Sequence, residues 1–193
     1  FLLYTSVLER LTAPLCDAVT AGTDSQVMLE GLERANLFVS SLDDVRQWYR
    51  YHHLFGDLLR ARLQQTEPEL VPILHARAAD WLVDNGQAAE AVGHALAGKD
   101  WSRASRLIEQ QAMNSMTDQP VMTFISWLSA LPAEHLLGRP WLCVYRAWSL
   151  MLGCRVQGVE DLLRHAEHHL QATSGPLDHR DVLGNIAMIR AYL

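Results

Sequence analysis

The chain has 193 residues, a formal net charge of −6 and a hydrophobic content of 49%, which indicates one large or two small globular domains. No stretch approaches 18 apolar residues, so the sequence excludes a transmembrane helix. The net negative charge is not that of a nucleic-acid-binding domain, which would be basic. We expect neither nucleic acid nor a membrane as a direct partner.

The first residues, FLLYTSVLERL, lack the basic start and the small-residue cleavage site of a secretory signal peptide. The chain has no initiator Met, begins with an apolar run and ends in another, IAMIRAYL. We therefore interpret it as part of a longer protein.

Several short helices are predicted near the start of the chain. Ser6-x-x-Glu9 has the spacing of a capping box, and Pro14 is expected to separate two short helices. Thr23-x-x-Gln26 should open a third helix, for which Asn36 is the expected stop.

A β-hairpin is predicted next, over residues 37–51. The strings LFVSSL and RQWYRY are rich in β-branched and aromatic residues and flank the short acidic turn DDV. A helix over 54–64 follows. Short helices, a hairpin and a closing helix predict a winged-helix subdomain over residues 1–66.

Beyond Pro68 the composition shifts to Ala, Leu and Trp, and the rest of the chain should be helical. We predict a helical arm over 67–139 and the start of a superhelical repeat domain over 140–193. The predicted helices cover 69–84, 87–97, 100–112, 120–130, 140–153, 156–172 and 178–193.

A faint repeat runs through this helical part. AADWLVDNGQAAEAVGHAL and RAWSLMLGCRVQGVEDLLRHA share Trp, Leu, Gly and Glu in the same order, and Glu90 and Glu160 are 70 positions apart, since 160 − 90 = 70. Two periods of 35 residues are near the roughly 34 residues of a tetratricopeptide repeat. The fold class is therefore mainly α, a small winged helix followed by a tetratricopeptide-like helical-repeat array.

The three cysteines, Cys16, Cys143 and Cys154, are an odd number without a C-x-x-C pair, and each lies among apolar neighbours. We predict buried free thiols in a reducing compartment, so the expected localisation is cytoplasmic.

The stretch from Gly93 to Asp100, GHALAGKD, nearly matches the phosphate loop of nucleotide-binding proteins. That loop requires a preceding strand, and Asp100 stands where its Mg²⁺-binding hydroxyl belongs. We interpret Gly98 as a helix C-cap and Asp100 as the next N-cap, and expect the chain itself not to bind ATP.

Neither the histidine-rich stretch near the end of the chain nor any other set of polar residues indicates a metal or catalytic site. His165 and His169 lie one helical turn apart in HAEHH, but Glu167 is misplaced for a zinc-protease motif, so a solvated helix face is expected and no metal. No catalytic arrangement is legible, and we expect no enzymatic activity within these residues.

The third helix would be the recognition helix if the winged helix bound DNA. Its polar face offers Gln26, Glu30, Glu33, Arg34 and Asn36. Because two of these side chains would repel phosphate, we do not expect direct DNA binding.

Three strings, FLLYTSVLERLTAPLCDAV, WYRYHHLFGDLLRARL and LHARAADWLVDNGQAAEAVGHALAGKDWSRASRLIE, resemble the MalT-like, LuxR-type bacterial transcription activators, which are signal-transducing ATPases with numerous domains. The resemblance implies an upstream ATPase domain using ATP and ADP, and a downstream DNA-binding domain. This chain resembles the middle of such a protein, which has a winged helix, an arm and the first sensor helices, on which an inducer or protein ligand would bind.

The same resemblance implies a role for His52. The wider family has a Met-His-Asp motif at the joint before the last winged-helix helix, and its His contacts the β-phosphate of ADP. Tyr51-His52-His53 aligns with that motif, with His53 where Asp is usual. A histidine can donate a hydrogen bond to phosphate.

The function expected on this basis is non-catalytic: a regulatory segment that relays nucleotide and inducer state to a DNA-binding domain outside these residues. The alternative from the residues alone is a helical-repeat scaffold that binds a protein or peptide. A hydrolase or metal site built on the histidines is a third, enzymatic possibility.

Overall fold

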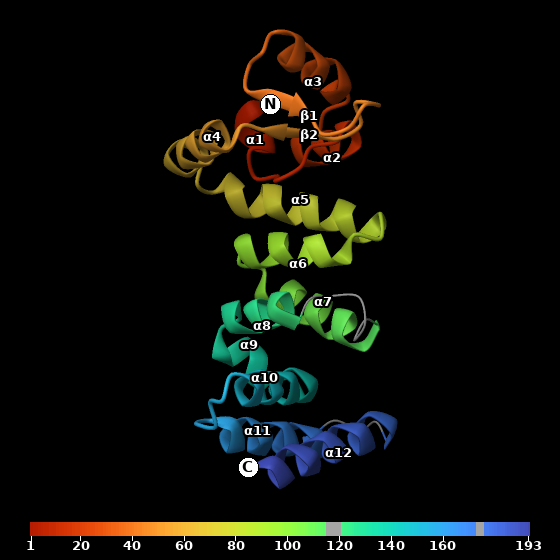
Figure 1. Ribbon diagram of the computed structural model, residues 1–193, viewed down its shortest axis with the longest axis vertical. Helices are drawn as coiled ribbons and strands as arrows, with labels where there is room; N and C mark the ends of the chain where they lie inside the picture. The colour runs from red at the N-terminus through yellow and green to blue at the C-terminus, as the bar shows by residue number, and fades with distance from the viewer. Residues whose placement is uncertain (115–120, 173–175) are drawn as a thin grey trace. The chain divides into compact units, whose positions relative to one another are not determined.

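The computed structural model of the protein describes residues 1–114, 121–172 and 176–193 (Figure 1). Over these residues it contains twelve helices and a single antiparallel pair of strands, which confirms the mainly α-helical class. The chain forms two compact units, residues 1–100 and 101–193.

The first unit contains α1 (Leu2–Thr5), α2 (Ala13–Thr20), α3 (Ser25–Arg34), β1 (Val39–Ser41), β2 (Tyr49–Tyr51), α4 (His53–Thr66), α5 (Leu70–Asp84) and α6 (Ala88–Ala97). The second contains α7 (Trp101–Asn114), α8 (Val121–Ala130), α9 (Ala133–Leu137), α10 (Pro140–Leu152), α11 (Val159–Ala172) and α12 (Pro176–Tyr192). The helices after Pro68 lie close to their predicted positions, although residue 120, the predicted start of one, lies outside the described residues.

The predicted hairpin is confirmed and forms the wing of a winged helix. β1 and β2 pair antiparallel, with Val39 opposite Tyr51 and Ser41 opposite Tyr49. Leu11 adds an isolated bridge on the other side of β2, because its backbone N–H and C=O both bond to Tyr49 at 2.8 Å. The segment between α1 and α2 is thereby tied to β2.

The predicted helix starts near the beginning of the chain are partly wrong. Ser6 is the C-cap of α1, and its hydroxyl donates to the Leu3 carbonyl instead of capping a new helix. Pro14 lies in the first turn of α2 and does not separate two helices. Proline is tolerated in a first turn because the N–H that it lacks would have no partner within the helix there. The N-cap of α2 is Thr12. Helix α3 begins at Ser25, not at Thr23.

Helix α5 shares the hydrophobic core of the winged helix. Leu74 and Ala78 on α5 are buried in the same cluster as Leu11 of the α1–α2 segment and Val19 of α2. The guanidinium of Arg77 also donates to the Val19 carbonyl at 2.9 Å. The predicted divisions after residues 66 and 139 stay predictions, but the core of the first unit extends across residue 66 into α5.

The second unit is built around α10, which packs along α11 and also contacts α8, α9 and α12. Small and medium residues line these contacts: Leu142, Cys143, Val144, Ala147, Leu163 and Ala166 are fully buried. The stretch LPAEHLLGRP, predicted as a break, contains the short helix α9, which begins after Pro132 and buries Leu136.

The two glutamates of the predicted repeat occupy corresponding positions. Glu90 lies in the first turn of α6 and Glu160 in the first turn of α11. Each forms an ion pair with an arginine from another element of its unit, Glu90 with Arg10 and Glu160 with Arg190. The tetratricopeptide period itself stays a prediction.

The cysteine prediction is right for two residues and wrong for one. Cys16 and Cys143 are buried, and burial raises the pKa of each thiol to about 12. Cys154 is exposed in the turn after α10, where its apolar neighbours Leu152 and Val156 are exposed too. Apolar neighbours in sequence therefore did not indicate burial here.

Among the described residues, no helix combines the length and apolar character that crossing a bilayer would require.

Candidate functional site

The joint between β2 and α4, residues 51–55, places two adjacent histidines at the start of a helix. His52 is the N-cap of α4 and has an extended backbone, with φ −55° and ψ 134°, and His53 is the first helical residue. The His52 N–H donates to the Phe38 carbonyl at 2.7 Å, and the His52 carbonyl accepts from Gly56 N–H at 2.9 Å. The backbone of His52 is therefore fixed by the hairpin and by the helix.

The two imidazole rings stack on each other and lie exposed beside an aromatic residue of the hairpin. The ring centroids of His52 and His53 are 4.5 Å apart with an interplanar angle of 29°. The Phe38 ring meets His52 edge-on, with centroids 6.4 Å apart. Both histidines are exposed, so both can reach a ligand outside this unit.

Phe38 itself adopts an unusual backbone conformation. Its φ is +58°, which is rare for an aromatic residue and costs free energy. The residue is 58% exposed, yet its ring also contacts that of Phe55 of α4, with ring centroids 5.1 Å apart. The strained position directs its carbonyl to His52 and holds the aromatic ring next to the histidines.

A buried tyrosine, Tyr51, attaches the joint to α1. The Tyr51 hydroxyl lies 2.6 Å from the Thr5 hydroxyl of α1, and burial raises the pKa of Tyr51. Tyr51 is 5% exposed. The exposed histidines thus follow directly after a buried residue with a fixed position, which limits the positions that the two rings can take.

The N-terminus of α4 can attract an anion. No side chain caps it, and its first turn contains no acidic residue. The first amides of a helix point outward and carry a partial positive charge, so phosphate binds favourably at such an end. In the family motif an Asp would stand here, whereas this chain has His53.

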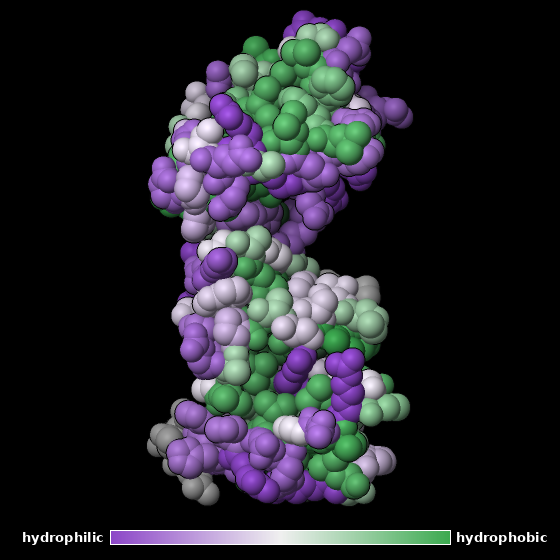
Figure 2. Space-filling view, turned by 90° about the vertical axis from the view of Figure 1, so that its left-hand side faces the viewer, coloured by the Kyte–Doolittle hydropathy of each residue, from purple (hydrophilic) through white to green (hydrophobic). Residues whose placement is uncertain are grey.

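Exposed apolar side chains surround the joint. Leu37 and Phe38 precede β1, and Leu54 and Leu58 lie on α4; these four residues are between 47% and 66% exposed. Figure 2 looks at the side of the molecule that carries α4 and shows apolar residues grouped on the first unit.

The near-match to a phosphate loop has the predicted helical context. Gly93 lies inside α6 and Gly98 is its C-cap, as predicted. Lys99 has a left-handed backbone with φ +58°, and the N–H of Asp100 donates to the Ala95 carbonyl. The segment is therefore a turn between helices and is not preceded by a strand.

The histidine pair singled out in the sequence, His165 and His169, lies on α11. His165 is exposed and His169 half-buried. Within the described ranges, no group of three or more His, Cys, Asp or Glu side chains is placed to hold a metal ion.

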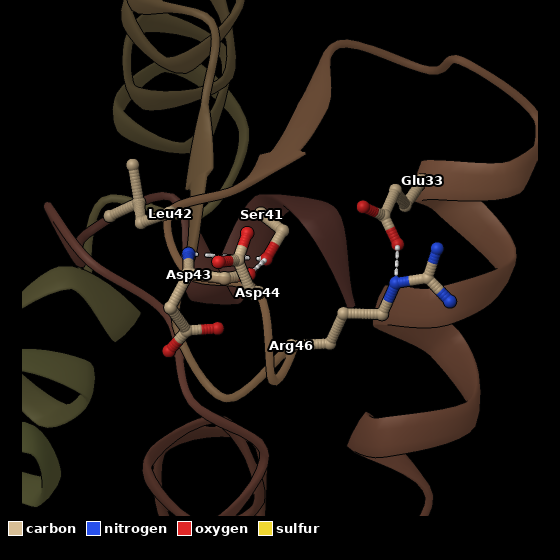
Figure 3. A pocket seen from close by; sticks show the side chains of 6 residues that line it. All are labelled: Glu33, Ser41, Leu42, Asp43, Asp44 and Arg46. Atoms are coloured by element: carbon tan, nitrogen blue, oxygen red, sulfur yellow. Dashed lines mark hydrogen bonds and ion pairs between the residues drawn. The ribbon is translucent and has the colours of Figure 1, made fainter.

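The polar face of α3 is engaged in contacts within the unit. The Gln26 amide donates to Glu30, which also pairs with Arg34, while Glu33 pairs with Arg46 at 3.3 Å. Figure 3 shows Glu33 and Arg46 at a shallow hollow of about 390 Å³ beside the hairpin turn, together with Ser41, Leu42, Asp43 and Asp44. The Asp43 carboxylate accepts the Gln47 and Trp48 amides, so it shapes the turn.

One pair of titratable residues was not predicted. His75 on α5 and His94 on α6 are half-buried, and their Nδ1 atoms are 2.9 Å apart. Burial lowers the pKa of both, that of His94 to about 4, where His75 also contributes. No local pattern indicates a pair of residues 19 positions apart on different helices.

Comparison with known proteins identifies the first part of the chain and relatives of most of it. Residues 1–71 match the MalT winged helix domain family. Over 152 residues, 79% of this chain, it is 36% identical to the serine/threonine-protein kinase PknK of Mycobacterium tuberculosis. Over 181 residues, 94% of this chain, it is 33% identical to the HTH-type transcriptional regulator MalT of Klebsiella pneumoniae. The matched parts cover 14% of the kinase and 20% of the regulator.

Proposed function

Residues 1–71 belong to the MalT winged helix domain family, and on this premise we propose that the chain is a non-catalytic regulatory segment of an ATP-dependent transcription regulator. In this proposal it relays nucleotide and inducer state to a DNA-binding domain elsewhere in the same polypeptide. Its nucleotide contact is His52, which approaches a phosphate of ADP bound to an upstream ATPase domain.

The observation that carries this proposal is the geometry of the joint. His52 is exposed, its backbone is held by two hydrogen bonds, and it stands at a helix end without a side-chain cap. A phosphate placed there would meet an imidazole donor and the positive end of the α4 dipole together. His53, stacked on His52, would limit the rotation of the His52 ring.

The relatives include both a kinase and a transcriptional regulator, which supports a regulatory role that does not depend on one particular output domain. Both contain a segment similar to this chain. A segment that is common to proteins with different outputs fits a step that precedes the output.

The test uses the full-length protein with His52→Ala, and with His53→Ala and His165→Ala as controls. A hydrogen bond to a charged group contributes about 1.5–3 kcal/mol, so His52→Ala should weaken ADP binding about 10- to 100-fold. In this proposal the ADP-bound state is the inactive resting state. A contact made only in that state stabilises it alone, so its loss should raise inducer-free transcription.

Calorimetry with ADP and a transcription assay without inducer measure the two effects. His53→Ala should have a smaller effect on both, and His165→Ala none, because His165 lies on α11 far along the chain. Unchanged ADP affinity and transcription in a folded His52→Ala protein would exclude the nucleotide role.

A further inference from the structure

Arg10 connects the hairpin to the second helix of the arm. Its guanidinium carbon lies 4.7 Å from the centroid of the Trp48 ring, directly before β2, and the same guanidinium forms an ion pair with Glu90 in the first turn of α6. Arg10 and Glu90 are 80 positions apart in the chain. One side chain thus touches two elements whose sequences are far apart.

The backbone beside Arg10 is bound to the same strand. Leu11, the next residue, exchanges two hydrogen bonds of 2.8 Å with Tyr49 of β2. Leu11 and Tyr49 are both fully buried. Arg10 is therefore attached to β2 through the Leu11 backbone and to Trp48 through its guanidinium. A displacement of α6 that moves Arg10 should also displace β2.

His52 stands at the other end of the same strand. β2 covers only Tyr49–Tyr51, so Trp48 and His52 flank it directly. At about 3.3 Å of rise per residue, the two flanking residues are separated by roughly 13 Å of extended backbone. A shift of β2 at one end is carried to the other, because so short a strand, paired with β1 along its length and bridged to Leu11 at Tyr49, does not bend independently.

We propose that Arg10 is a coupling residue that transmits displacements of the hairpin to α6 and of α6 to the hairpin. The coupling stands on the contacts of Arg10 alone; its use in passing nucleotide state from His52 to the arm rests on the function proposed above.

The size of the effect follows from the exposure of the pair. The side chains of Arg10 and Glu90 are each 44% exposed, so the ion pair is partly screened by water. Exposed pairs and exposed cation–ring contacts change an equilibrium about two- to fivefold each. Arg10 should therefore shift the equilibrium between positions of the arm by a small factor and should not hold the arm in a single position.

Amide hydrogen exchange in the 193-residue chain tests the coupling at a distance. Glu90→Gln removes the ion pair in α6 while keeping the shape of the side chain. The Leu11 and Tyr49 amides, which form the bridge to β2, should then exchange about two- to fivefold faster. In an Arg10→Ala background, Glu90→Gln should cause no further change at these amides. Arg10→Lys, which keeps the charge, should retain part of the protection.

Asp57→Ala is the matched control. Asp57 pairs with Arg60 within α4, the two side chains being 66% and 44% exposed, and neither residue belongs to the hairpin or to α6. If Asp57→Ala accelerates the same amides as much as Glu90→Gln does, the effect is a general loss of stability and the coupling is refuted. Additive effects of Arg10→Ala and Glu90→Gln, or no effect of Glu90→Gln, refute it as well.

The full-length protein then separates the coupling from the proposed function. Arg10→Ala should weaken ADP binding at most about two- to fivefold, far less than His52→Ala, and should raise or lower inducer-free transcription by a similar factor, because coupling between two sites is reciprocal. If His52→Ala has no effect on ADP binding while the exchange coupling is present, the nucleotide role fails and the coupling stands. If transcription is unchanged by Arg10→Ala while His52→Ala acts as expected, the role of Arg10 in the relay is overturned.

Discussion

The Nδ1 atoms of His75 and His94 lie 2.9 Å apart, although the two residues belong to different helices. At this distance one ring donates an N–H to the bare nitrogen of the other, so the pair requires at least one neutral imidazole. If both rings were protonated, two N–H groups and two positive charges would face each other. The contact between α5 and α6 is therefore sensitive to protonation.

The first prediction concerns the pH dependence of stability. Burial lowers the pKa of His94 from 6.5 to about 4, so the unfolded chain takes up a proton before the folded chain as pH falls. The free energy of unfolding should then decrease between about pH 6.5 and 4, by on the order of 1–3 kcal/mol. His94→Gln should remove this part of the slope, and His165→Gln, which alters an exposed residue, should not.

Urea denaturation at a series of pH values measures these slopes. The comparison uses the difference in slope between variants, because carboxylates also titrate in this range and affect all variants equally. Equal slopes for the His94→Gln chain and the unsubstituted chain would show that the histidine pair does not control stability in acid.

The second prediction uses the two glycines of the stretch that resembles a phosphate loop. A Cβ added at Gly98 would lie 2.9 Å from the Cβ of His75 and 3.3 Å from the His94 carbonyl, whereas nothing lies within 4 Å of a Cβ added at Gly93. Gly98→Ala should therefore destabilise the protein by about 1–3 kcal/mol through overpacking. Gly93→Ala, inside α6, should stabilise it by about 0.5–1 kcal/mol.

Thermal or urea unfolding of the two variants provides the measurement, and each variant is the control for the other. The same sign for both substitutions would contradict the proposed role of Gly98, which is to let α6 end directly against His75.

The third prediction concerns Arg190 of α12, which pairs with Glu160 at 2.9 Å and Glu167 at 2.6 Å on α11. The pKa of Glu160 is lowered chiefly by its hydrogen bond from Arg190. Arg190→Ala should reduce stability by on the order of 1 kcal/mol, since the three charges form a network between two helices. The loss should shrink in high salt, which screens exposed charges.

Arg164→Ala is the comparison for this network. Arg164 also pairs with Glu160, but both residues belong to α11, so its removal should cost only a few tenths of a kcal/mol. Denaturation at low and high salt measures both variants. Losses of equal size for Arg164 and Arg190 would show that the link between helices adds nothing.

The sequence predicted the elements well where periodicity and turn chemistry were strong. Aromatic and β-branched residues around the Asp43–Asp44 turn led to the hairpin, and the Ala- and Leu-rich pattern led to the later helices. Capping was less predictable, because Ser6-x-x-Glu9 has the right spacing but its Ser bonds backward to Leu3. Spacing alone does not decide which neighbour a hydroxyl chooses.

The candidate site was predictable only in part. His52 was chosen on a resemblance, and the structure adds its exposure, its fixed backbone and the strained Phe38 beside it. The Arg10–Glu90 and His75–His94 pairs join residues 80 and 19 positions apart. Such contacts depend on how helices pack in three dimensions, which no local pattern of residue types encodes.

The burial of α5 in the winged-helix core has a mechanical consequence. Leu74 and Ala78 of this 15-residue helix are buried in that core, Trp81 packs against it, and the helix ends at Asp84. At 1.5 Å per residue the helix is about 22 Å long, so a rotation of the winged helix by roughly 10° would swing that end through about 4 Å. Because α5 is packed into the winged-helix core, a small rotation of that core is carried to the end of the helix as a displacement comparable to the width of a side chain.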